Sequence, residues 1–502
     1  MFRYIIFLCC FLPTLLSAQL YDYQWVIGNG PNDPADKAGG TLLDFHTDPV
    51  SISYRPLGPG GRSFSFTNIC NAEGELQLYT NNCTMLNEQD EMIREGSGLN
   101  YPGKVYDLNC APYHGYNIRS PFFLPLPGSP DKYVLFHLRY DVDPTAAFFY
   151  HVESLLYSTV DAATANGQGA IIEKNTLLAK DTLCDMLAAV RHGNGRDWWV
   201  VCPQFNSDQS FLCLLTPEGV QGPYLRQTPL KWGGDLSIFW WEQAVFSPDG
   251  RRYARANNKN DIQVFDFDRC SGEFFNGLHL SLPVEDKATT GLAISANSRF
   301  IYISTGFKIY QFDLLHCNPQ ASRLLLAEYN FDLDPLAISF NSMQLAPDGK
   351  IYVNSTNGMY RLTVINNPDA PGLSCNLVQH GVELPTRIGR WLPNFPNFRL
   401  YDEQDSPCDT LMSVSGHIAP KPALRLSIAP NPARDFVQIG YLSEQVGRLR
   451  VFDAAGRVLW SEVAVAGSHA CQLDVSIWPA GFYVLVLDSG QEVMRQRFVV
   501  VR

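Results

Sequence analysis

The chain has 502 residues, of which 46% are hydrophobic, 12% aromatic and 18% charged. This length corresponds to about two to four domains, and the apolar content excludes wholesale disorder. The formal net charge is −12, from 38 Lys and Arg against 50 Asp and Glu. Such an excess of acidic residues does not provide the broad positive surface that nucleic acid requires, so no nucleic-acid partner is expected.

The N-terminus has the pattern of a secretory signal peptide. A positive charge precedes an apolar run over residues 5–16, and small residues follow before a cut near Ala18. We therefore expect residues 1–18 to be a signal peptide. A lipid anchor on Cys9 or Cys10 is the competing interpretation. No later stretch reaches ~18 uninterrupted apolar residues, so no transmembrane segment is expected in the mature chain.

The predicted export of the protein changes how its cysteines are interpreted. Thirteen occur, two of them in the signal region, which leaves eleven. In an oxidising compartment they favour disulfides over metal ligation, and no CxxC pair follows the cut. If residues 203–212 form a hairpin, Cys202 and Cys213 face each other and form a disulfide. Cys83 and Cys110 bracket a Gly- and Asn-rich loop and are a second candidate pair. The odd count leaves at least one thiol free.

A turn followed by an aromatic or aliphatic strand recurs six times between residues 64 and 401. The turns are residues 71–74 (NAEG), 128–131 (GSPD), 192–195 (HGNG), 247–250 (SPDG), 295–298 (SANS) and 346–349 (APDG). The strands after them read LQLYT, KYVLFHL, DWWVVC, RYARA, FIYIST and IYVNS. Pro-Asp-Gly suits such a corner because Pro presets φ, Asp caps the turn and Gly accepts a positive φ.

Repeats of ~40–50 residues with four strands are typical of propeller blades. We therefore predict an all-β fold in which residues 19–401 form a β-propeller of six to seven blades. Six blades are countable in the sequence. We expect a seventh in which residues 41–45 and 390–401 share one sheet and so close the ring, and seven is the preferred total. A series of separate β-sandwiches is the alternative.

The C-terminal part changes in character. Residues 402–423 are polar and contain proline, which is typical of a linker. Residues 424–502 contain short alternating strands separated by turn signals, which predicts a small Ig-like β-sandwich.

Three motifs in this region occur in a fixed order. They are residues 429–433 (APNPA), 450–457 (RVFDAAGR) and 479–484 (PAGFYV). Together they resemble the type A C-terminal sorting domain of the type IX secretion system (T9SS) of Bacteroidetes. The residues that carry this resemblance are Pro430, Asn431, Pro432, Gly456, Gly481 and Tyr483.

The resemblance implies that the type IX secretion machinery is a partner. The protein would pass through the periplasm and cross the outer membrane, and would then be extracellular or held at the outer-membrane surface. In this family the sorting domain is usually removed. An adhesive Ig-like module is the alternative for this region.

The N-terminal part also resembles a group of proteins. The segments at residues 25–28, 69–80, 87–99, 192–199 and 265–272 resemble uncharacterised secreted propellers of the same bacteria, and the resemblance covers most of residues 21–401. This resemblance implies a propeller fold, but it carries over no known catalytic or binding activity.

The sequence has no GxSxG elbow, HExxH helix, P-loop or complete dinucleotide fingerprint, so no catalytic residue or cofactor is expected. Three acid pairs have alternate spacing. They are Asp141 with Asp143, Asp266 with Asp268, and Asp332 with Asp334. On a strand both carboxylates of a pair share one face, which suits Ca²⁺ binding or acid–base work. Solvated strand-end loops are the alternative.

Aromatic and basic residues give a candidate ligand platform, because the inner strands of propellers line a central channel. These residues are Arg191, His192, Trp198 and Trp240, with buried packing between blades as the alternative. The first functional hypothesis is a non-catalytic propeller that binds an extracellular glycan, peptide or protein. The second is a secreted hydrolase or polysaccharide lyase, which a convergence of His, Asp, Glu or Arg at the channel mouth would favour. A structural part of an extracellular layer is the third.

Overall fold

The computed structural model describes residues 19–28, 39–57, 65–113, 115, 119–142, 150–233, 242–257, 260–286, 289–333, 339–355, 359–389, 391–403, 408, 425–443, 445–465, 467–490 and 493–502. The predicted signal peptide and most of the predicted linker lie outside these residues.

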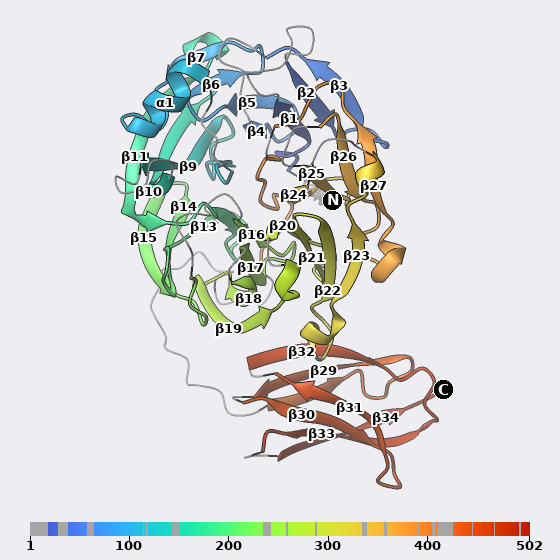
Figure 1. Cartoon of the computed structure of the whole chain (residues 1–502). Helices are drawn as coiled ribbons and strands as arrows, with labels where there is room; N and C mark the ends of the chain where they lie inside the picture. The colour runs from blue at the N-terminus through green and yellow to red at the C-terminus, as the bar shows by residue number, and fades with distance from the viewer. Residues whose placement is uncertain are drawn as a thin grey trace, which may run out of the picture.

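Most of the described chain forms a ring of seven blades, coloured from blue to orange in Figure 1. Over the described residues, blade 1 has three strands and each later blade has four. Blades 2 and 3 are joined into one sheet where β7 lies parallel to β11. Seven blades confirm the predicted fold class and the preferred count.

The blades follow one another in chain order. Blade 1 contains β1 (Gln24–Gly28), β2 (Gly40–Asp44) and β3 (Ser51–Arg55); blade 2 contains β4 (Thr67–Cys70), β5 (Leu76–Thr80), β6 (Thr84–Asn87) and β7 (Met92–Ser97); blade 3 contains β8 (Phe122–Pro125), β9 (Lys132–Val142), β10 (Tyr150–Asp161) and β11 (Ala170–Leu183); blade 4 contains β12 (Ala188–Arg191), β13 (Trp198–Pro203), β14 (Gln209–Thr216) and β15 (Gly219–Gln227). Blade 5 contains β16 (Glu242–Phe246), β17 (Arg252–Asn257), β18 (Asp261–Asp268) and β19 (Glu273–Leu280); blade 6 contains β20 (Thr289–Ile294), β21 (Phe300–Thr305), β22 (Lys308–Asp313) and β23 (Leu324–Glu328); blade 7 contains β24 (Phe340–Leu345), β25 (Ile351–Ser355), β26 (Arg361–Ile365) and β27 (Leu377–Glu383).

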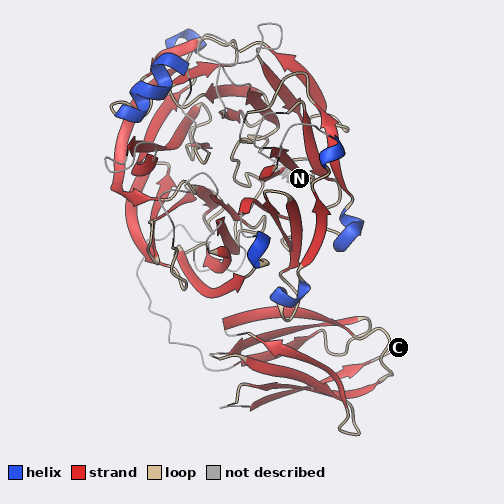
Figure 2. Ribbon diagram, viewed as in Figure 1, coloured by secondary structure: helices blue, strands red, loops and turns tan. Residues whose placement is uncertain are grey.

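Helices are short and peripheral to this architecture. The α-helix α1 (Lys104–Tyr113) lies at the outer edge of the ring (Figure 2). The 3₁₀ helices are η1 (Ala165–Gly167), η3 (Val284–Asp286), η4 (Pro319–Ser322), η5 (Phe331–Leu333) and η6 (Gly372–Cys375). No helix among the described residues is long and apolar enough to cross a membrane.

The six predicted turns each join the first and second strands of blades 2–7. In the turn of blade 5, the Gly250 N–H donates to the Ser247 carbonyl at 2.8 Å, and Gly250 has φ +72°. The Asp249 carboxylate accepts the Ser247 hydroxyl and the Arg251 N–H. The strand that follows each turn is largely buried, and β21 is buried throughout. A tight turn thus leads directly into a strand that packs between its neighbours.

The ring closes differently from our prediction. We expected residues 390–401 to share a sheet with residues 41–45. Residues 41–44 belong to β2, but described residues 391–401 form no strand. Blades 1 and 7 instead meet through side chains, where the Trp25 ring centroid lies 5.8 Å from that of Tyr352. The hydroxyl oxygens of Thr41 and Thr386 are 2.7 Å apart.

The C-terminal part forms two packed sheets, shown in red in Figure 1. One sheet has the order β28-β29-β32 and the other β31-β30-β33-β34. Their bounds are β28 (Arg425–Ala429), β29 (Phe436–Ser443), β30 (Gly447–Phe452), β31 (Val458–Ala464), β32 (Gly467–Asp474), β33 (Gly481–Asp488) and β34 (Val493–Val500). Alternate residues of both sheets, such as Ile439 and Leu485, are fully buried between them, which is the predicted β-sandwich.

Candidate functional site

Residues 391–401, which we call the axial segment, run through the inside of the ring. The Asn394 amide donates to the carbonyls of Ser120 and Leu187 at 2.7 and 3.0 Å. Farther along, the Asn397 amide donates to the Pro248 carbonyl at 2.7 Å. Two amide side chains thus satisfy backbone carbonyls from three different blade regions, and the chain itself fills part of the channel that a propeller leaves along its axis.

A cavity of about 260 Å³ remains beside the axial segment, and we call it the axial cavity. Its walls come from the first strands of blades 4–7 and from the turns that follow three of them. The strands of blades 4–6 contribute alanines to the lining, at positions 188, 189, 244 and 293. Their short side chains leave space where larger ones would meet at the axis.

Two titratable residues line the axial cavity, and they are paired with each other. The Arg399 guanidinium donates to both carboxylate oxygens of Asp22, with Nη2 at 2.9 Å from Oδ2. Asp22 is buried. The two charges are thus engaged with each other, and the described lining offers binding surface and fixed dipoles.

A smaller pocket of about 20 Å³, the arginine pocket, lies on the other side of Asn394. The buried Arg119 guanidinium donates to the Glu242 carbonyl and to the Gln243 amide oxygen. It also lies 4.8 Å from the ring centroid of Trp391. Burial lowers the pKa of Arg119 to about 10, a value at which the guanidinium still carries its charge at neutral pH.

Two acids accompany Arg119. The Asp185 carboxylate accepts the backbone N–H groups of Arg119 and Ser120, both at 3.2 Å. Burial, and after it the charge of Asp185, raises the pKa of Glu242 to about 8. Glu242 therefore holds a proton near neutral pH. Arg119 and Asp185 line this pocket, whereas the Glu242 side chain is not part of its lining. All three groups are buried, and Arg119 and Asp185 are engaged with the protein itself.

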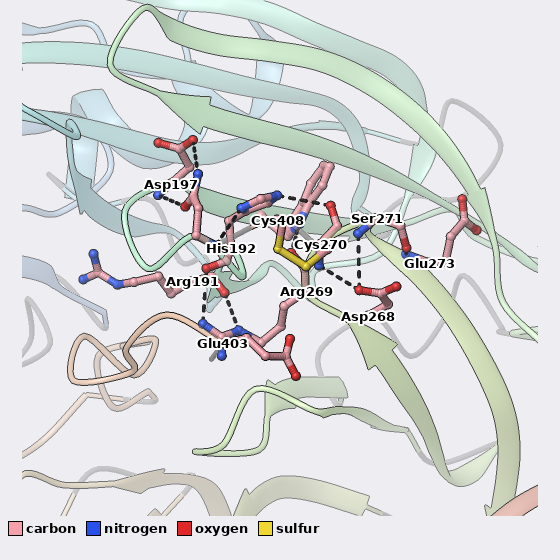
Figure 3. The surroundings of a disulfide bond; sticks show 12 residues. Arg191, His192, Asp197, Asp268, Arg269, Cys270, Ser271, Glu273, Glu403 and Cys408 are labelled. Carbon is pink, nitrogen blue, oxygen red and sulfur yellow. Dashed lines mark hydrogen bonds between the residues drawn. A yellow bond between two sulfur atoms is a disulfide. The ribbon is translucent and has the colours of Figure 1, made fainter. Parts of the chain in front are cut away.

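The predicted ligand platform lies inside the protein. The Trp198 ring is fully buried, and the Arg191 guanidinium carbon lies 4.2 Å from its centroid. Arg191 also donates to the Phe398 carbonyl of the axial segment at 3.2 Å. His192 bonds the Cys270 carbonyl at 3.1 Å, and burial lowers the pKa of His192 (Figure 3). These residues pack blade 4 against blade 5 and the axial segment, whereas Trp240 lies outside the described residues.

The acid pairs are also engaged locally. Asp266 accepts the Asn276 amide at 2.9 Å, and its carboxylate lies 3.7 Å from Arg252. Asp268 caps the turn after β18 by accepting the Cys270 N–H at 2.8 Å. In the part of the chain that the structure describes, no three His, Cys, Asp or Glu residues form a group that could hold a metal ion. Asp143 and Asp334 lie outside that part.

The structure confirms one predicted disulfide and corrects the other. Cys83 is bonded to Cys110. Cys202 and Cys213 are both reduced and buried, because the hairpin pairs Cys202 with Phe211 and Cys213 with Val200. The two cysteines are therefore diagonal neighbours, whose Cα atoms in a sheet lie ~7–8 Å apart, too far for a disulfide.

Two further disulfides were not predicted. They join Cys270 to Cys408 and Cys317 to Cys471. Their partners are separated by 138 and 154 residues in sequence, so no local spacing signals them.

The motif residues of the C-terminal sandwich have structural roles. The Asn431 side chain bonds β34 twice, through the Val499 N–H at 3.0 Å and the Arg497 carbonyl at 3.3 Å. The peptide bonds before Pro430 and Pro432 are cis.

The remaining motif residues shape a turn and a strand. Gly456 has φ +78° in the turn between β30 and β31. Gly481 opens β33. Two residues later the Tyr483 hydroxyl donates to the Pro479 carbonyl at 2.6 Å. These motif residues thus define turns and strand ends.

Comparison with protein families identifies this sandwich. Residues 427–501 match the secretion system C-terminal sorting domain. The chain therefore carries the sorting domain of the type IX secretion system, which directs it to the cell surface or the extracellular space. The secretion machinery is accordingly a partner of this domain.

Solved structures resemble the chain only distantly. A Bacteroides uniformis protein provisionally named a 6-phosphogluconolactonase has 12% identity and a TM-score of 0.44, over 73% of this chain and 98% of its own. A Lactobacillus plantarum protein has 11% identity and a TM-score of 0.40, over 74% and 99%. The Dos1 propeller has 14% identity and a TM-score of 0.35, over 63% and 71%. Among curated proteins no match is found. These values carry no information about chemistry.

Proposed function

We propose that this exported propeller is a non-catalytic binding protein, and that it receives a terminal group of an extracellular glycan, peptide or protein in the axial cavity. The observation that supports this is the lining of the cavity. Apolar side chains, from alanine to Phe246 and Phe395, form most of the walls, and the titratable groups of the lining, Asp22 and Arg399, neutralise each other. Such a surface binds by shape and burial, with a few fixed polar groups setting orientation.

The volume of the axial cavity limits the ligand groups that it can hold. At about 260 Å³ it is just below the range of ~300–1,000 Å³ common for ligand pockets. It accommodates one bulky side chain or one sugar residue rather than a length of polymer. The remaining contacts of a larger partner would then be made on the rim, where the turns of blades 5–7 lie.

The test blocks the mouth of the cavity without touching the core. Ala296 is exposed, lies in the turn of blade 6 and lines the cavity. The full chain is screened against glycan and peptide arrays, and the best ligand is titrated against Ala296→Trp. We expect at least a tenfold weaker affinity, because the indole fills the opening.

The matched control is Ala454→Trp. Ala454 is also an exposed alanine at the second position of a tight turn, but it lies in the sorting domain. Its affinity should equal that of the unmodified chain. Equal binding by Ala296→Trp would show that the ligand does not use the axial cavity, and the proposal would then be abandoned.

A secreted hydrolase or polysaccharide lyase is the second candidate. It is favoured by Glu242 beside the arginine pocket, because this carboxyl interacts electrostatically with Asp185 and Arg119 and holds a proton near neutral pH. A protonated carboxylic acid near neutral pH is a suitable general acid. Turnover of ester, lactone or polyuronate substrates that disappears in Glu242→Gln would support this candidate. Turnover that Glu242→Gln leaves unchanged would exclude Glu242 as its acid.

A further inference from the structure

One disulfide connects the propeller to the sorting domain. Cys317 follows β22 in blade 6, and Cys471 lies within β32 of the sandwich. Their Cα atoms are 4.7 Å apart, and both side chains are almost completely buried. Cys317 packs within the hydrophobic core of the sandwich, although it belongs to the propeller part of the chain.

The contact around this bond extends to the backbone. β32 is an edge strand of its sheet, and an edge strand has unpaired N–H and carbonyl groups. The Gln472 N–H donates to the Leu315 carbonyl at 3.1 Å. The Tyr441 hydroxyl donates to the Cys317 carbonyl at 3.4 Å. The loop of blade 6 therefore covers part of this edge.

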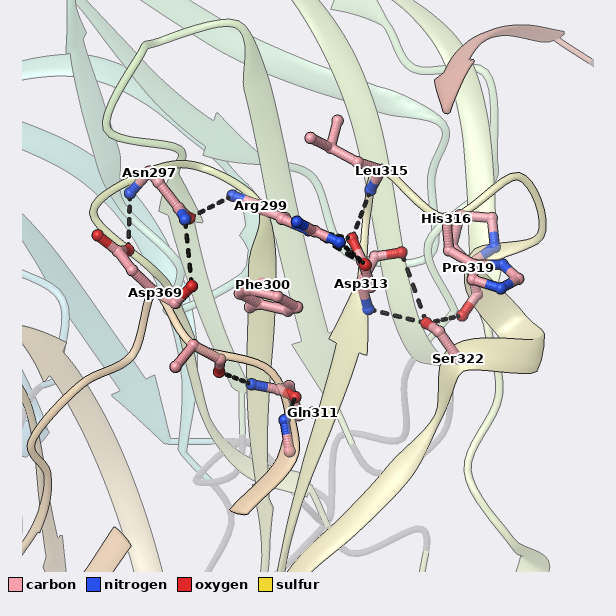
Figure 4. A network of polar contacts seen from close by, with 12 residues as sticks. Asn297, Arg299, Phe300, Gln311, Asp313, Leu315, His316, Pro319, Ser322 and Asp369 are labelled. Atoms are coloured by element: carbon pink, nitrogen blue, oxygen red, sulfur yellow. Dashed lines mark hydrogen bonds and ion pairs between the residues drawn. The ribbon is translucent and has the colours of Figure 1, made fainter. Parts of the chain in front are cut away.

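The loop that presents Cys317 is held in place within blade 6 (Figure 4). The Asp313 carboxylate accepts two nitrogens of the Arg299 guanidinium and the Leu315 N–H, at 2.7–3.1 Å. The Ser322 hydroxyl donates to the Pro319 carbonyl at 2.7 Å. The cysteine is thus offered from a fixed position rather than from an unsupported loop.

The other long-range disulfide fixes the chain where it leaves the propeller. Cys408 is bonded to Cys270 in the turn after β18 (Figure 3). Just before it, the Glu403 N–H donates to the Gly193 carbonyl at 2.8 Å. A side chain at residue 193 would collide with both sulfur atoms of the bond, so the glycine of this turn makes room for the disulfide.

We propose that these two disulfides keep the propeller and the sorting domain in one covalent molecule after the segment between them is cut. A cut between residues 403 and 408 leaves the C-terminal piece bonded to Cys270 through Cys408. A cut between residues 409 and 424 leaves it bonded to Cys317 through Cys471. The sorting domain is then a lasting part of the exported protein, attached to blade 6.

The experiment places a site-specific protease sequence at residues 412–418 of the full chain, exported through an oxidising periplasm. The cut protein is alkylated, denatured and separated without reductant. We expect one species that migrates with the uncut chain. Dithiothreitol should separate two fragments, because it supplies the two electrons and two protons that each disulfide needs and closes its own disulfide.

Two variants locate the connection. Cys471→Ser should give two fragments without reductant, whereas Cys270→Ser should still give one. Mass spectrometry of the unmodified chain should find the Cys317 and Cys471 peptides linked, and this measurement does not depend on the folding of a variant. Separation of the unmodified cut chain without reductant, or absence of the linked peptides, would overturn the proposal.

Discussion

Glu242 lies at the start of β16 beside the arginine pocket, and its proton is predicted to control the stability of the propeller. Burial, and after it the neighbouring Asp185, raises the pKa of its carboxyl from 4.5 to about 8. The folded state therefore holds a proton that the unfolded state gives up above pH 4.5. The stability this provides is fully present below pH 4.5 and is lost as the pH rises through 8.

The size of the effect follows from the two pKa values. Each pKa unit corresponds to about 1.4 kcal/mol. The shift from 4.5 to about 8 thus corresponds to a loss of about 4–5 kcal/mol of unfolding free energy between mildly acidic and mildly alkaline pH. Glutamine has nearly the shape of the protonated acid and does not titrate, so Glu242→Gln should remove this dependence.

The assay is urea denaturation of the full chain at pH 5, 6.5 and 8.5. Glu242→Gln should match the unmodified chain within about 1 kcal/mol at pH 5, and exceed it by about 3–5 kcal/mol at pH 8.5. The exposed Glu91 gives the matched control, since Glu91→Gln should leave the pH profile unchanged. If Glu242→Gln and the unmodified chain lose stability equally between pH 5 and 8.5, the reasoning about Glu242 is refuted.

Three further outcomes are expected. Burial lowers the pKa of His137 from 6.5 to about 3. Between these pH values only the unfolded state takes up a proton at this histidine, so the free energy of unfolding falls as the pH drops from 6.5 towards 3. His137→Gln should flatten that part of an acid-denaturation curve. Asn394→Ala leaves two buried carbonyls without their amide donor and should lower the free energy of unfolding, measured by urea denaturation, by about 2–4 kcal/mol. The control Asn367→Ala, at an exposed asparagine, should lower it by less than about 0.5 kcal/mol. Equal losses for the two variants would contradict the role of the axial segment. Calorimetric titration with Ca²⁺ should show no heat, because Asp266 and Asp268 are occupied by neighbouring donors, and a saturable signal would restore the predicted calcium site.

The propeller was predictable because its signal is local. Each turn and the strand after it lie within about a dozen residues, and their chemistry depends on φ values and on burial of alternate side chains. The turn at residues 247–250 and the strand after it are found as predicted. The sorting domain was predictable for the same reason, since Asn431, Gly456 and Tyr483 each act within or next to a single turn or strand end.

The hairpin cysteines show how far such local reasoning extends. The sequence correctly places Cys202 and Cys213 on two adjacent strands. It does not set the register, because a shift of two residues keeps every side chain on the same face and leaves the hydrophobic pattern unchanged. The alternation that identifies the strands therefore carries no information on whether the two sulfurs are opposite or diagonal.

The position of the axial segment was predicted wrongly, and the physical reason is stronger than for the register of the cysteine hairpin. Residues 391–401 are rich in aromatic residues and proline, and a strand in the last blade would bury the same rings. The position at the axis is decided by Asn394, whose amide matches carbonyls near residues 120 and 187. Those carbonyls come together only once blades 3 and 4 have formed, so the contact cannot be read from the segment itself.

The same dependence on distant partners governs the candidate sites. Asp185 and Glu242 are ordinary acids in sequence, and the pKa of Glu242 is raised only because the ring buries it next to Asp185. Likewise Cys317 and Cys471 belong to different domains and meet only when the sorting domain packs against blade 6. The residues of the sequence motifs form turns and strand ends. The groups with a shifted pKa or a long-range disulfide are instead brought together by the folded ring. Mutagenesis of this protein should therefore begin at the axis and at the contact between the two domains.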